Sequence, residues 1–187
     1  MAELPKHAKV VVIGQGGIVG ASVVHHLIEE GWDDIVGLEK SAIPTDIGST
    51  SHASDFCYMT THDKLNVFTS TYSREFYKKR GNYIEIGGME VARKDDDERM
   101  LELIRKVGSG KAFGTNAHMI SAAEAKEKFP LLEESEIQGA LWDPDAGLVT
   151  PRSQKVAGDL VDEAVASGKL KAFAYTPATK ILVEDGV

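Results

Sequence analysis

Cysteine is almost absent from this sequence, which has one, Cys57, among its 187 residues. A single cysteine can form neither an intrachain disulfide nor a cysteine metal cluster, and this favours a reducing compartment. Long apolar runs are also missing, because none approaches the roughly 20 residues that a membrane-spanning helix needs. Only eight residues precede the first predicted strand, too few for a signal or transit peptide. The sequence therefore predicts a cytoplasmic protein without a membrane partner.

An excess of positive charge is lacking as well. The chain has 21 Lys and Arg residues against 29 Asp and Glu residues, a formal net charge of −8. This balance argues against nucleic acid as a partner, because a phosphate backbone requires a basic face. The histidines show no spacing typical of metal ligands, so we predict no metal site.

The segment from Lys9 to Lys40 has the order strand, glycine-rich turn, helix, strand and acid. Lys9–Ile13 is a short β-branched run, and Ile35–Leu38 is a second apolar run. Between them, apolar residues recur at helical spacing from Ile18 onwards, and Gly31 follows at the position of a helix C-terminal glycine. We therefore predict a βαβ unit with two parallel strands.

A glycine turn between a strand and a helix is typical of dinucleotide sites. Glycine lets the backbone approach a pyrophosphate, and the helix N-terminus directs N–H groups at its negative charge. Glu39 ends the second predicted strand, 25 residues after Gly14, where a carboxylate can accept hydrogen bonds from a ribose. We predict a dinucleotide site. The alternative is an ordinary βαβ unit with a glycine-rich loop.

The glycine spacing departs from the usual G-x-G-x-x-G pattern. Gly14, Gly16 and Gly20 leave three residues in the second gap. The register Gln15, Gly17, Gly20 has the usual spacing but lacks the first glycine. We favour the first register, with one extra residue in the turn, because the strand before it and the helix after it keep their patterns.

The rest of the chain has the patterns of mixed helices and strands. A polar segment, Ser41–Thr61, is expected to be mostly loop and to start near the cofactor. Helices are predicted over Lys64–Arg80, over Asp95–Val107, and over a short stretch that is opened by a capping box at Ser121–Glu124. A further helix is predicted to open at Pro151 and to continue through Ser153–Ala166. Strands are predicted within Tyr83–Arg93 on either side of the pair Gly87-Gly88, and over Ile137–Trp142, Lys169–Ala174 and Ala178–Val183.

The helical patterns also predict which side chains form the core. The expected inward residues are Leu65, Phe68, Tyr72, Phe76 and Tyr77 on the first of these helices, Met100, Leu101, Ile104 and Val107 on the second, and Val156, Leu160 and Val161 on the last.

No linker divides the sequence, and we expect one interrupted sheet system. The βαβ unit and its loop cover residues 1–63, an inserted mixed segment covers 64–142, and residues 143–187 return to the first sheet. The last residues, 184–187, have the pattern of a turn that begins another strand. We therefore expect a truncated chain.

Several stretches resemble the amino-terminal part of the FAD-dependent amine oxidoreductases. They are VVVIGQGGIVGASVVHHL, VGLEK, GSTSHA, IGGMEVAR, FPLL, GALWDPDAGLVTPRS and TPATKI. The most similar branch contains dimethylglycine dehydrogenase, dimethylglycine oxidase and sarcosine dehydrogenase. The resemblance covers nearly all of this chain but well under half of a family member. It implies an α/β fold with a Rossmann-like FAD-binding βαβ unit, an inserted α+β segment, and a truncated glutathione-reductase-type flavin domain.

The resemblance also implies FAD rather than NAD as the cofactor. In this family a histidine of a Ser-Thr-x-His-Ala motif bonds covalently to the 8α-methyl carbon of FAD, and here that histidine is His52. The alternative for His52 is a solvated loop residue. Carried over by position, Gly14, Gly16 and Gly20 would line the pyrophosphate with Gly17 nearby, and Glu39 would bind the ribose. The residues that would border the pyrophosphate and isoalloxazine are Lys40, Ser49, Thr50, Ser51 and His52. The segment Thr176–Ile181, which includes Ala178, resembles the one whose backbone meets the adenine.

The implied reaction is oxidation of an N-methyl amine or amino acid such as dimethylglycine or sarcosine, by hydride transfer to flavin. The electron acceptor stays open, folate takes part only if a further C-terminal region is present, and no catalytic base is identified. Two alternatives remain. One is a sibling FAD enzyme, such as an amino-acid oxidase or a glycerol-3-phosphate-type dehydrogenase. The other is a truncated nucleotide-binding module without turnover.

Overall fold

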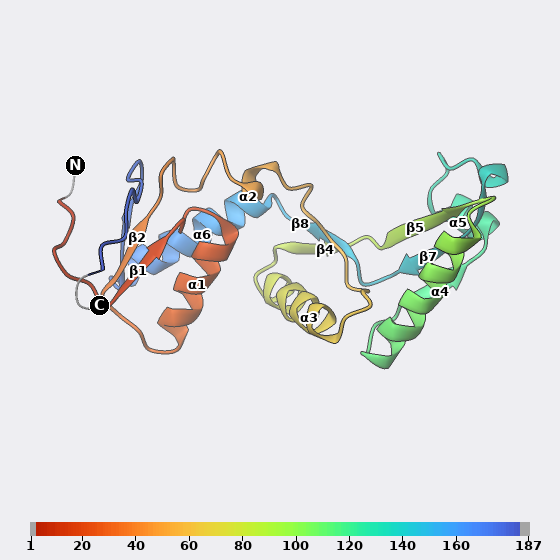
Figure 1. Cartoon of the computed structure of the whole chain (residues 1–187), viewed down its shortest axis with the longest axis horizontal. Helices are drawn as coiled ribbons and strands as arrows, with labels where there is room; N and C mark the ends of the chain where they lie inside the picture. The colour runs from red at the N-terminus through yellow and green to blue at the C-terminus, as the bar shows by residue number, and fades with distance from the viewer. Residues whose placement is uncertain (1–2, 184–187) are drawn as a thin grey trace. The chain divides into compact units, whose positions relative to one another are not determined.

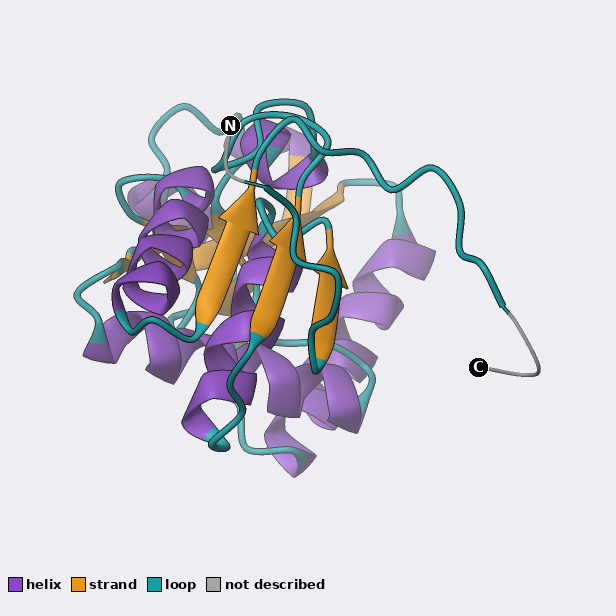
Figure 2. Cartoon of the chain, turned by 90° about the vertical axis from the view of Figure 1, so that its left-hand side faces the viewer, coloured by secondary structure: helices purple, strands orange, loops and turns teal. Residues whose placement is uncertain are grey.

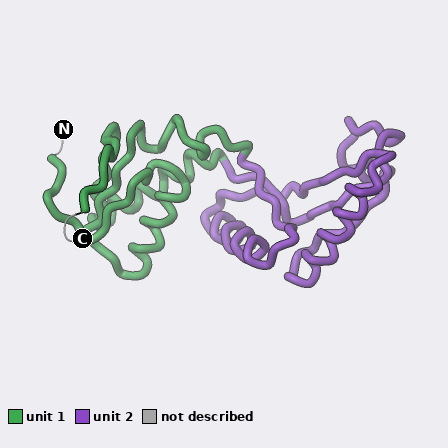
Figure 3. Tube along the Cα trace, viewed as in Figure 1, with its two compact units in different colours: residues 1–54, 151–187 green, residues 55–150 purple. Residues whose placement is uncertain are grey.

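The structure, a computed structural model, describes residues 3–183 and divides into two compact units (Figures 1 and 3). Unit 1 consists of Met1–Ser54 and Pro151–Val187, and unit 2 consists of Asp55–Thr150. Unit 2 is therefore inserted into the sequence of unit 1. It begins before residue 64 and ends after residue 142, because the short strands at both of its ends pair with one another.

Unit 1 is built on a three-stranded parallel sheet, whose strands lie side by side in Figure 2. Ile35 and Leu170 pair in register and are both buried. The strand order is β1 (Val10–Ile13), β2 (Ile35–Leu38), β9 (Leu170–Phe173). Two helices of unit 1, α1 (Ile18–Glu29) and α6 (Ser153–Ala166), pack on each other. Each helix connects to a parallel strand, so the predicted Rossmann-like α/β fold is confirmed. After Pro151 the chain adds α6 and β9, and β9 pairs with β2 of this sheet.

The predicted last strand, Ala178–Val183, is wrong. These residues have no strand structure and are exposed. Just before them, the N–H groups of Tyr175 and Thr176 donate to the carbonyl oxygens of Ser41 and Glu39 at 2.9 and 2.7 Å. An apolar run forms a strand only where a neighbouring strand supplies hydrogen bonds, and none does so here among the described residues. The turn predicted at 184–187 lies outside the described residues.

Unit 2 contains two antiparallel sheets of three strands each. The first has the order β3 (Phe56–Cys57), β8 (Gly147–Val149), β4 (Tyr83–Glu85) and is contacted by α3 (Lys64–Lys79). The second has the order β5 (Gly88–Arg93), β7 (Ile137–Asp143), β6 (His118–Ile120). It is contacted by α4 (Asp97–Ala112) and α5 (Ala122–Lys128), and the short 3-10 helix η1 (Glu134–Glu136) precedes β7.

The two faces of the second sheet have separate apolar clusters. Leu103 and Val107 of α4 pack with Leu141 on one face. Ala125 of α5 packs with Ala140 on the other. The predicted capping box that opens α5 is present, and it fixes the start of this helix.

The predicted loop Ser41–Thr61 contains regular structure that its composition did not indicate. It includes the four-residue helix α2 (Ser49–His52) and strand β3. Strand β3 forms because it pairs with β8, some ninety residues later in the chain. The rest of the segment is irregular, so the prediction of a mostly irregular segment is confirmed, and these two short elements are the exceptions to it.

The predicted inward face of α3 is also wrong. Leu65, Phe68 and Tyr72 are 67%, 66% and 51% exposed, whereas Val67 is buried. Phe76 and Tyr77, further along the helix, are half-buried. An apolar stripe at helical spacing identifies a helix, but the position of the neighbouring sheet decides which side is buried.

The inward face of α4 was predicted only in part. Val107 is buried and Met100 packs against the core cluster, as expected. Leu101 and Ile104 are 52% and 47% exposed, and the fully buried residue is Leu103. On α6, by contrast, Val156, Leu160 and Val161 are all buried as predicted.

Residues 3–183 contain neither a candidate membrane-spanning helix nor a candidate metal-binding cluster. No helix in this part of the chain combines the length and the apolar composition needed to cross a bilayer. Nor do these residues place three or more His, Cys, Asp or Glu side chains together as potential metal ligands.

Candidate dinucleotide-binding site

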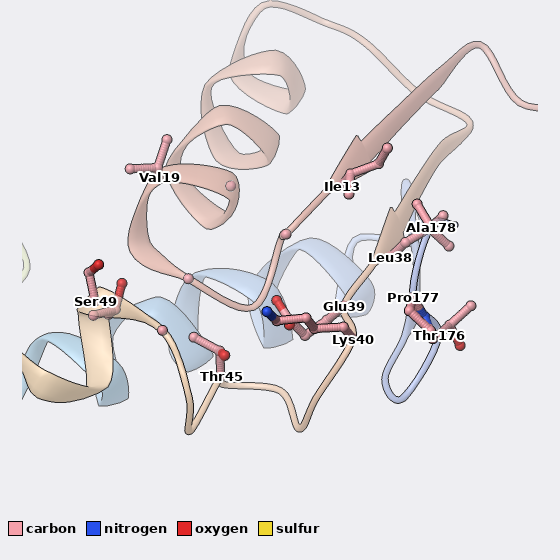
Figure 4. A pocket seen from close by; sticks show the side chains of 15 residues that line it. Ile13, Val19, Leu38, Glu39, Lys40, Thr45, Ser49, Thr176, Pro177 and Ala178 are labelled. Carbon is pink, nitrogen blue, oxygen red and sulfur yellow. The ribbon is translucent and has the colours of Figure 1, made fainter. Parts of the chain in front are cut away.

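A pocket of about 390 Å³ lies in unit 1 where β1 and β2 end (Figure 4). Ligands of open parallel sheets bind outside the carboxyl ends of the strands, which makes this the candidate site. Its lining comprises Ile13, Gly14, Gly17, Val19, Gly20, Leu38, Glu39, Lys40, Thr45, Gly48, Ser49, Thr50, Thr176, Pro177 and Ala178.

The glycine turn allows α1 to begin directly against the end of β1. The N–H of Gly14 donates to the carbonyl of Leu38 at 2.8 Å, and Gly14 has a φ of +85°. A Cβ atom at Gly20 would lie 2.4 Å from the carbonyl oxygen of Gly14, a distance that real Cβ atoms do not reach. Glycine at this position is therefore required by the contact between helix and turn.

The geometry supports the register Gln15, Gly17, Gly20 rather than the one favoured from the sequence. Gly17 is the N-cap residue of α1 and lines the pocket. Gly16 does not line it, because its N–H donates to Glu39 Oε2 at 3.2 Å and its carbonyl accepts the N–H of Thr45 at 2.9 Å. The lining also includes Gly14 but not Gln15, so of this register only Gly17 and Gly20 line the pocket.

Gln15 occupies the position of the first glycine and is fully buried. Its side chain fills space beside β2 that Gly37 leaves open, since a Cβ at Gly37 would lie 2.5 Å from Gln15 Cγ. Within the described part of the chain, neither amide atom of Gln15 has a hydrogen-bond partner. The sequence analysis missed this pair, although a glycine in a strand often marks a close approach.

Glu39 is the buried acid of the pocket, only 5% exposed. Its Oε2 accepts the Gly16 N–H and its Oε1 accepts the Ser41 N–H, both at 3.2 Å. These two bonds orient the carboxylate between the glycine turn and the loop after β2 (Figure 4). Each carboxylate oxygen has two lone pairs, so the group can still accept hydrogen bonds from a hydroxylated ligand.

The N-terminus of α1 supplies the positive end of the pocket. The Ile18 N–H donates to Thr50 Oγ1 at 3.0 Å, and Thr50 is buried. The N–H groups of Val19 and Gly20 have no acceptor inside the helix because they belong to its first turn. Both residues line the pocket, where the helix dipole favours an anion such as a pyrophosphate.

His52 lies at the end of α2 and is exposed, outside the pocket lining. Its Nδ1 is 2.9 Å from the carbonyl oxygen of Gly48. Because a carbonyl can only accept, Nδ1 carries the proton in this contact. The neutral ring then has its free lone pair on Nε2.

The structure brings most of the predicted site residues together. Gly14, Gly17, Gly20, Glu39, Lys40, Ser49, Thr50 and Ala178 line the pocket, and Gly16, Ser51 and His52 do not. Thr176 belongs to the segment Thr176–Ile181 that was expected at the adenine, whereas sequence reasoning missed Thr45 as a lining residue. Both lie in segments whose position depends on hydrogen bonds to distant backbone groups, Gly16 for Thr45 and Glu39 for Thr176.

Comparison with known proteins identifies the family. The family model described as FAD dependent oxidoreductase matches residues 9–187. The chain is 29% identical over 190 residues to the mitochondrial pyruvate dehydrogenase phosphatase regulatory subunit of Mus musculus, covering 98% of this chain and 21% of that protein. It is 31% identical over 156 residues to the mitochondrial sarcosine dehydrogenase of Homo sapiens, covering 79% of this chain and 16% of that protein.

The fold comparison agrees with the family match. The crystal structure of L-proline dehydrogenase from P. horikoshii superposes with a TM-score of 0.85 and 29% identity, over 97% of this chain and 48% of that one. The chain thus spans about a fifth of the first of these curated relatives, about a sixth of the second and about half of this solved structure. With a family match over nearly its whole length, the chain belongs to the FAD dependent oxidoreductase family.

Proposed function

We propose that this chain binds the adenosine diphosphate part of FAD in an enzyme that oxidises an amine. One observation carries the proposal: the α1 N-terminus, the close-packed Gly20 and the Glu39 carboxylate meet in a single pocket. These groups fit the ligand, because the helix N-terminus suits a pyrophosphate and the carboxylate suits ribose hydroxyls. When bound, FAD would supply the hydride acceptor, and the chain's own residues bind and orient it.

The proposed substrate class is an N-methyl amine or amino acid such as sarcosine or dimethylglycine. The support is the similarity to human sarcosine dehydrogenase and the sequence motifs shared with that branch. The substrate would react as the free amine, because a protonated nitrogen has no lone pair to assist loss of hydride. No residue of this chain is assigned as a catalytic base.

Anaerobic mixing tests the substrate class. FAD-loaded protein containing this chain is mixed with sarcosine, dimethylglycine, L-proline or glycine, and the visible absorbance of oxidised flavin is recorded. We expect the N-methyl amines to bleach the flavin fastest. Faster bleaching by L-proline or glycine would instead favour a sibling amino-acid enzyme.

Covalent attachment of the flavin through His52 is part of the proposal. It rests on the Ser49-Thr50-Ser51-His52-Ala53 motif and on the tautomer that leaves the Nε2 lone pair free. Intact-mass measurement of denatured, FAD-loaded protein should show an increase of one FAD, mapped to the peptide with His52. The His52→Gln variant should lose this increase and His62→Gln should keep it. Retention of the adduct in His52→Gln would disprove the attachment.

A second candidate function is regulatory, without turnover. The observation that favours it is the 29% identity, over 98% of this chain, to a protein named as a phosphatase regulatory subunit. The same anaerobic experiment separates the two functions. Bound flavin that no amine reduces would support the regulatory candidate and contradict the amine oxidoreductase.

A further inference from the structure

Unit 2 contains a second pocket that the proposed function does not use. Its volume is about 470 Å³, within the range of small-molecule sites. It lies on the face of the second sheet that α5 covers. The lining comprises Phe56, Ile86, Gly87, Gly88, Met89, Val91, Lys128, Phe129, Leu132 and Trp142, and we call it the aryl pocket.

Two consecutive glycines let aromatic rings form the wall of the aryl pocket. A Cβ at Gly87, whose φ is +77°, would lie 2.1 Å from the Trp142 ring. A Cβ at Gly88 would lie 2.7 Å from the Phe56 ring. Any side chain at either position would displace these rings, so the glycines preserve a flat apolar surface. Phe129 at the end of α5 adds a third ring, 51% exposed.

Lys128 is the one charged residue among those that line this pocket. Its Nζ lies 4.3 Å from the centroid of the Trp142 ring, over the aromatic face. Cation–π contact holds an ammonium group beside an apolar surface without using its hydrogen-bond donors.

Glu124, one turn before Lys128 on α5, is engaged by other groups. Across residues 3–183, Lys128 forms no ion pair with a carboxylate. The Glu124 carboxylate accepts hydrogen bonds from the Ser121 N–H and hydroxyl. These bonds are the main cause that lowers the pKa of Glu124, and the charge of Lys128 lowers it to a smaller degree. The other lysine of the last α5 turn, Lys126, donates to the Leu132 carbonyl. Lys128 is therefore the cation that remains available to a ligand in this pocket.

We infer that the aryl pocket binds an apolar carboxylate, with the hydrocarbon body against Trp142 and Phe56 and the carboxylate at Lys128. The apolar walls contribute burial, and the ammonium contributes a charge-assisted hydrogen bond. Charge sets the selectivity, because the described lining residues include a cation and no acidic side chain. An amine of the same size would bring a second positive charge to Lys128. The aryl pocket shares no lining residue with the dinucleotide pocket, and no part of the inference depends on the flavin.

Fluorescence of Trp142 provides a direct test. The chain has two tryptophans, and replacing the exposed Trp32 of unit 1 by Phe leaves Trp142 as the reporter. This Trp32→Phe protein is titrated with 3-phenylpropionate and with 3-phenylpropylamine, which share their apolar body and differ in charge. We expect saturable binding of the acid, and weaker binding of the amine by at least about tenfold.

Variants assign the effect to Lys128. Lys128→Gln should weaken binding of 3-phenylpropionate by about tenfold and reduce the difference in affinity between this acid and 3-phenylpropylamine. Lys111→Gln, which removes an exposed charge on α4 outside the pocket lining, should leave both affinities unchanged. No saturable binding of the acid, equal binding of acid and amine, or an unchanged affinity in Lys128→Gln would each overturn the inference. Circular dichroism confirms that each variant is folded, which is expected because Lys128 is exposed.

Discussion

Replacing Gly20 by Ala tests the packing that creates the dinucleotide site. The added Cβ would lie 2.4 Å from the Gly14 carbonyl oxygen and 2.6 Å from Gln15 Cα, and these backbone atoms cannot rotate away as a side chain can. Overpacking of this kind costs about 1–3 kcal/mol. The higher helix propensity of Ala offsets up to about 1 kcal/mol of this loss. We expect a net loss of about 1–2 kcal/mol in the free energy of unfolding.

The assay for Gly20→Ala is urea denaturation followed by circular dichroism, together with titration by ADP. With a urea slope of about 2 kcal/mol/M, the midpoint should fall by about 0.5–1 M. Affinity for ADP should also fall, because α1 must move away from the turn. The matched control is Gly108→Ala in α4, where the added Cβ meets nothing within 4 Å and the exposed helix should gain up to about 1 kcal/mol. A Gly20→Ala protein as stable as the original, with unchanged ADP affinity, would refute the reasoning.

Two further predictions concern single side chains. Gln15→Leu should raise the free energy of unfolding by about 1–3 kcal/mol in urea denaturation, because it removes two buried amide atoms that lack partners among the described residues; a loss of stability would contradict this account of Gln15. Hydrogen bonds from the Ser121 N–H and hydroxyl hold the pKa of Glu124 below its ordinary value of 4.5. The stabilisation is therefore present above pH 4.5 and lost as the pH falls through the folded-state pKa. Carboxyl NMR titration should show the Glu124 pKa rising in Ser121→Ala, and an unchanged pKa would contradict the capping box as its cause.

The parts of the fold that were predicted correctly depend on local sequence patterns. The periodicity from Ile18 onwards, the apolar run Ile35–Leu38 and the Ser121 capping box each determine structure within a few residues of themselves. The burial of Val156 and Leu160 on α6 was also predicted because only one apolar stripe is available there.

The parts that were mispredicted depend on distant partners. Val67 rather than Phe68 is buried on α3 because the position of the neighbouring sheet selects the face. The Ala178–Val183 run has strand composition but no strand beside it. These outcomes follow from tertiary contacts that local periodicity does not encode.

In the candidate site too, features set by local sequence patterns were predicted and features set by distant contacts were not. Glu39 and Gly20 could be placed from the order of strand, turn, helix and acid. The glycine register could not, because the choice depends on how Gln15 fits beside Gly37, 22 positions later in the chain. Thr45 joins the pocket through a backbone hydrogen bond to Gly16 that no sequence motif indicates.

The central claim is that the pocket at the ends of β1 and β2 holds the adenosine diphosphate part of FAD through Glu39. The most direct measurement is calorimetric titration of the protein with FAD, ADP and FMN, which lacks the adenosine half. FAD and ADP should compete for one site and FMN should not bind there. Glu39→Gln should weaken the binding of FAD and of ADP by about 10- to 150-fold, which is the effect of losing one hydrogen bond to a charged group. The control Glu30→Gln, at the exposed C-terminal end of α1, should leave both affinities unchanged. FMN binding as tight as FAD, or full ADP affinity in Glu39→Gln, would contradict the account.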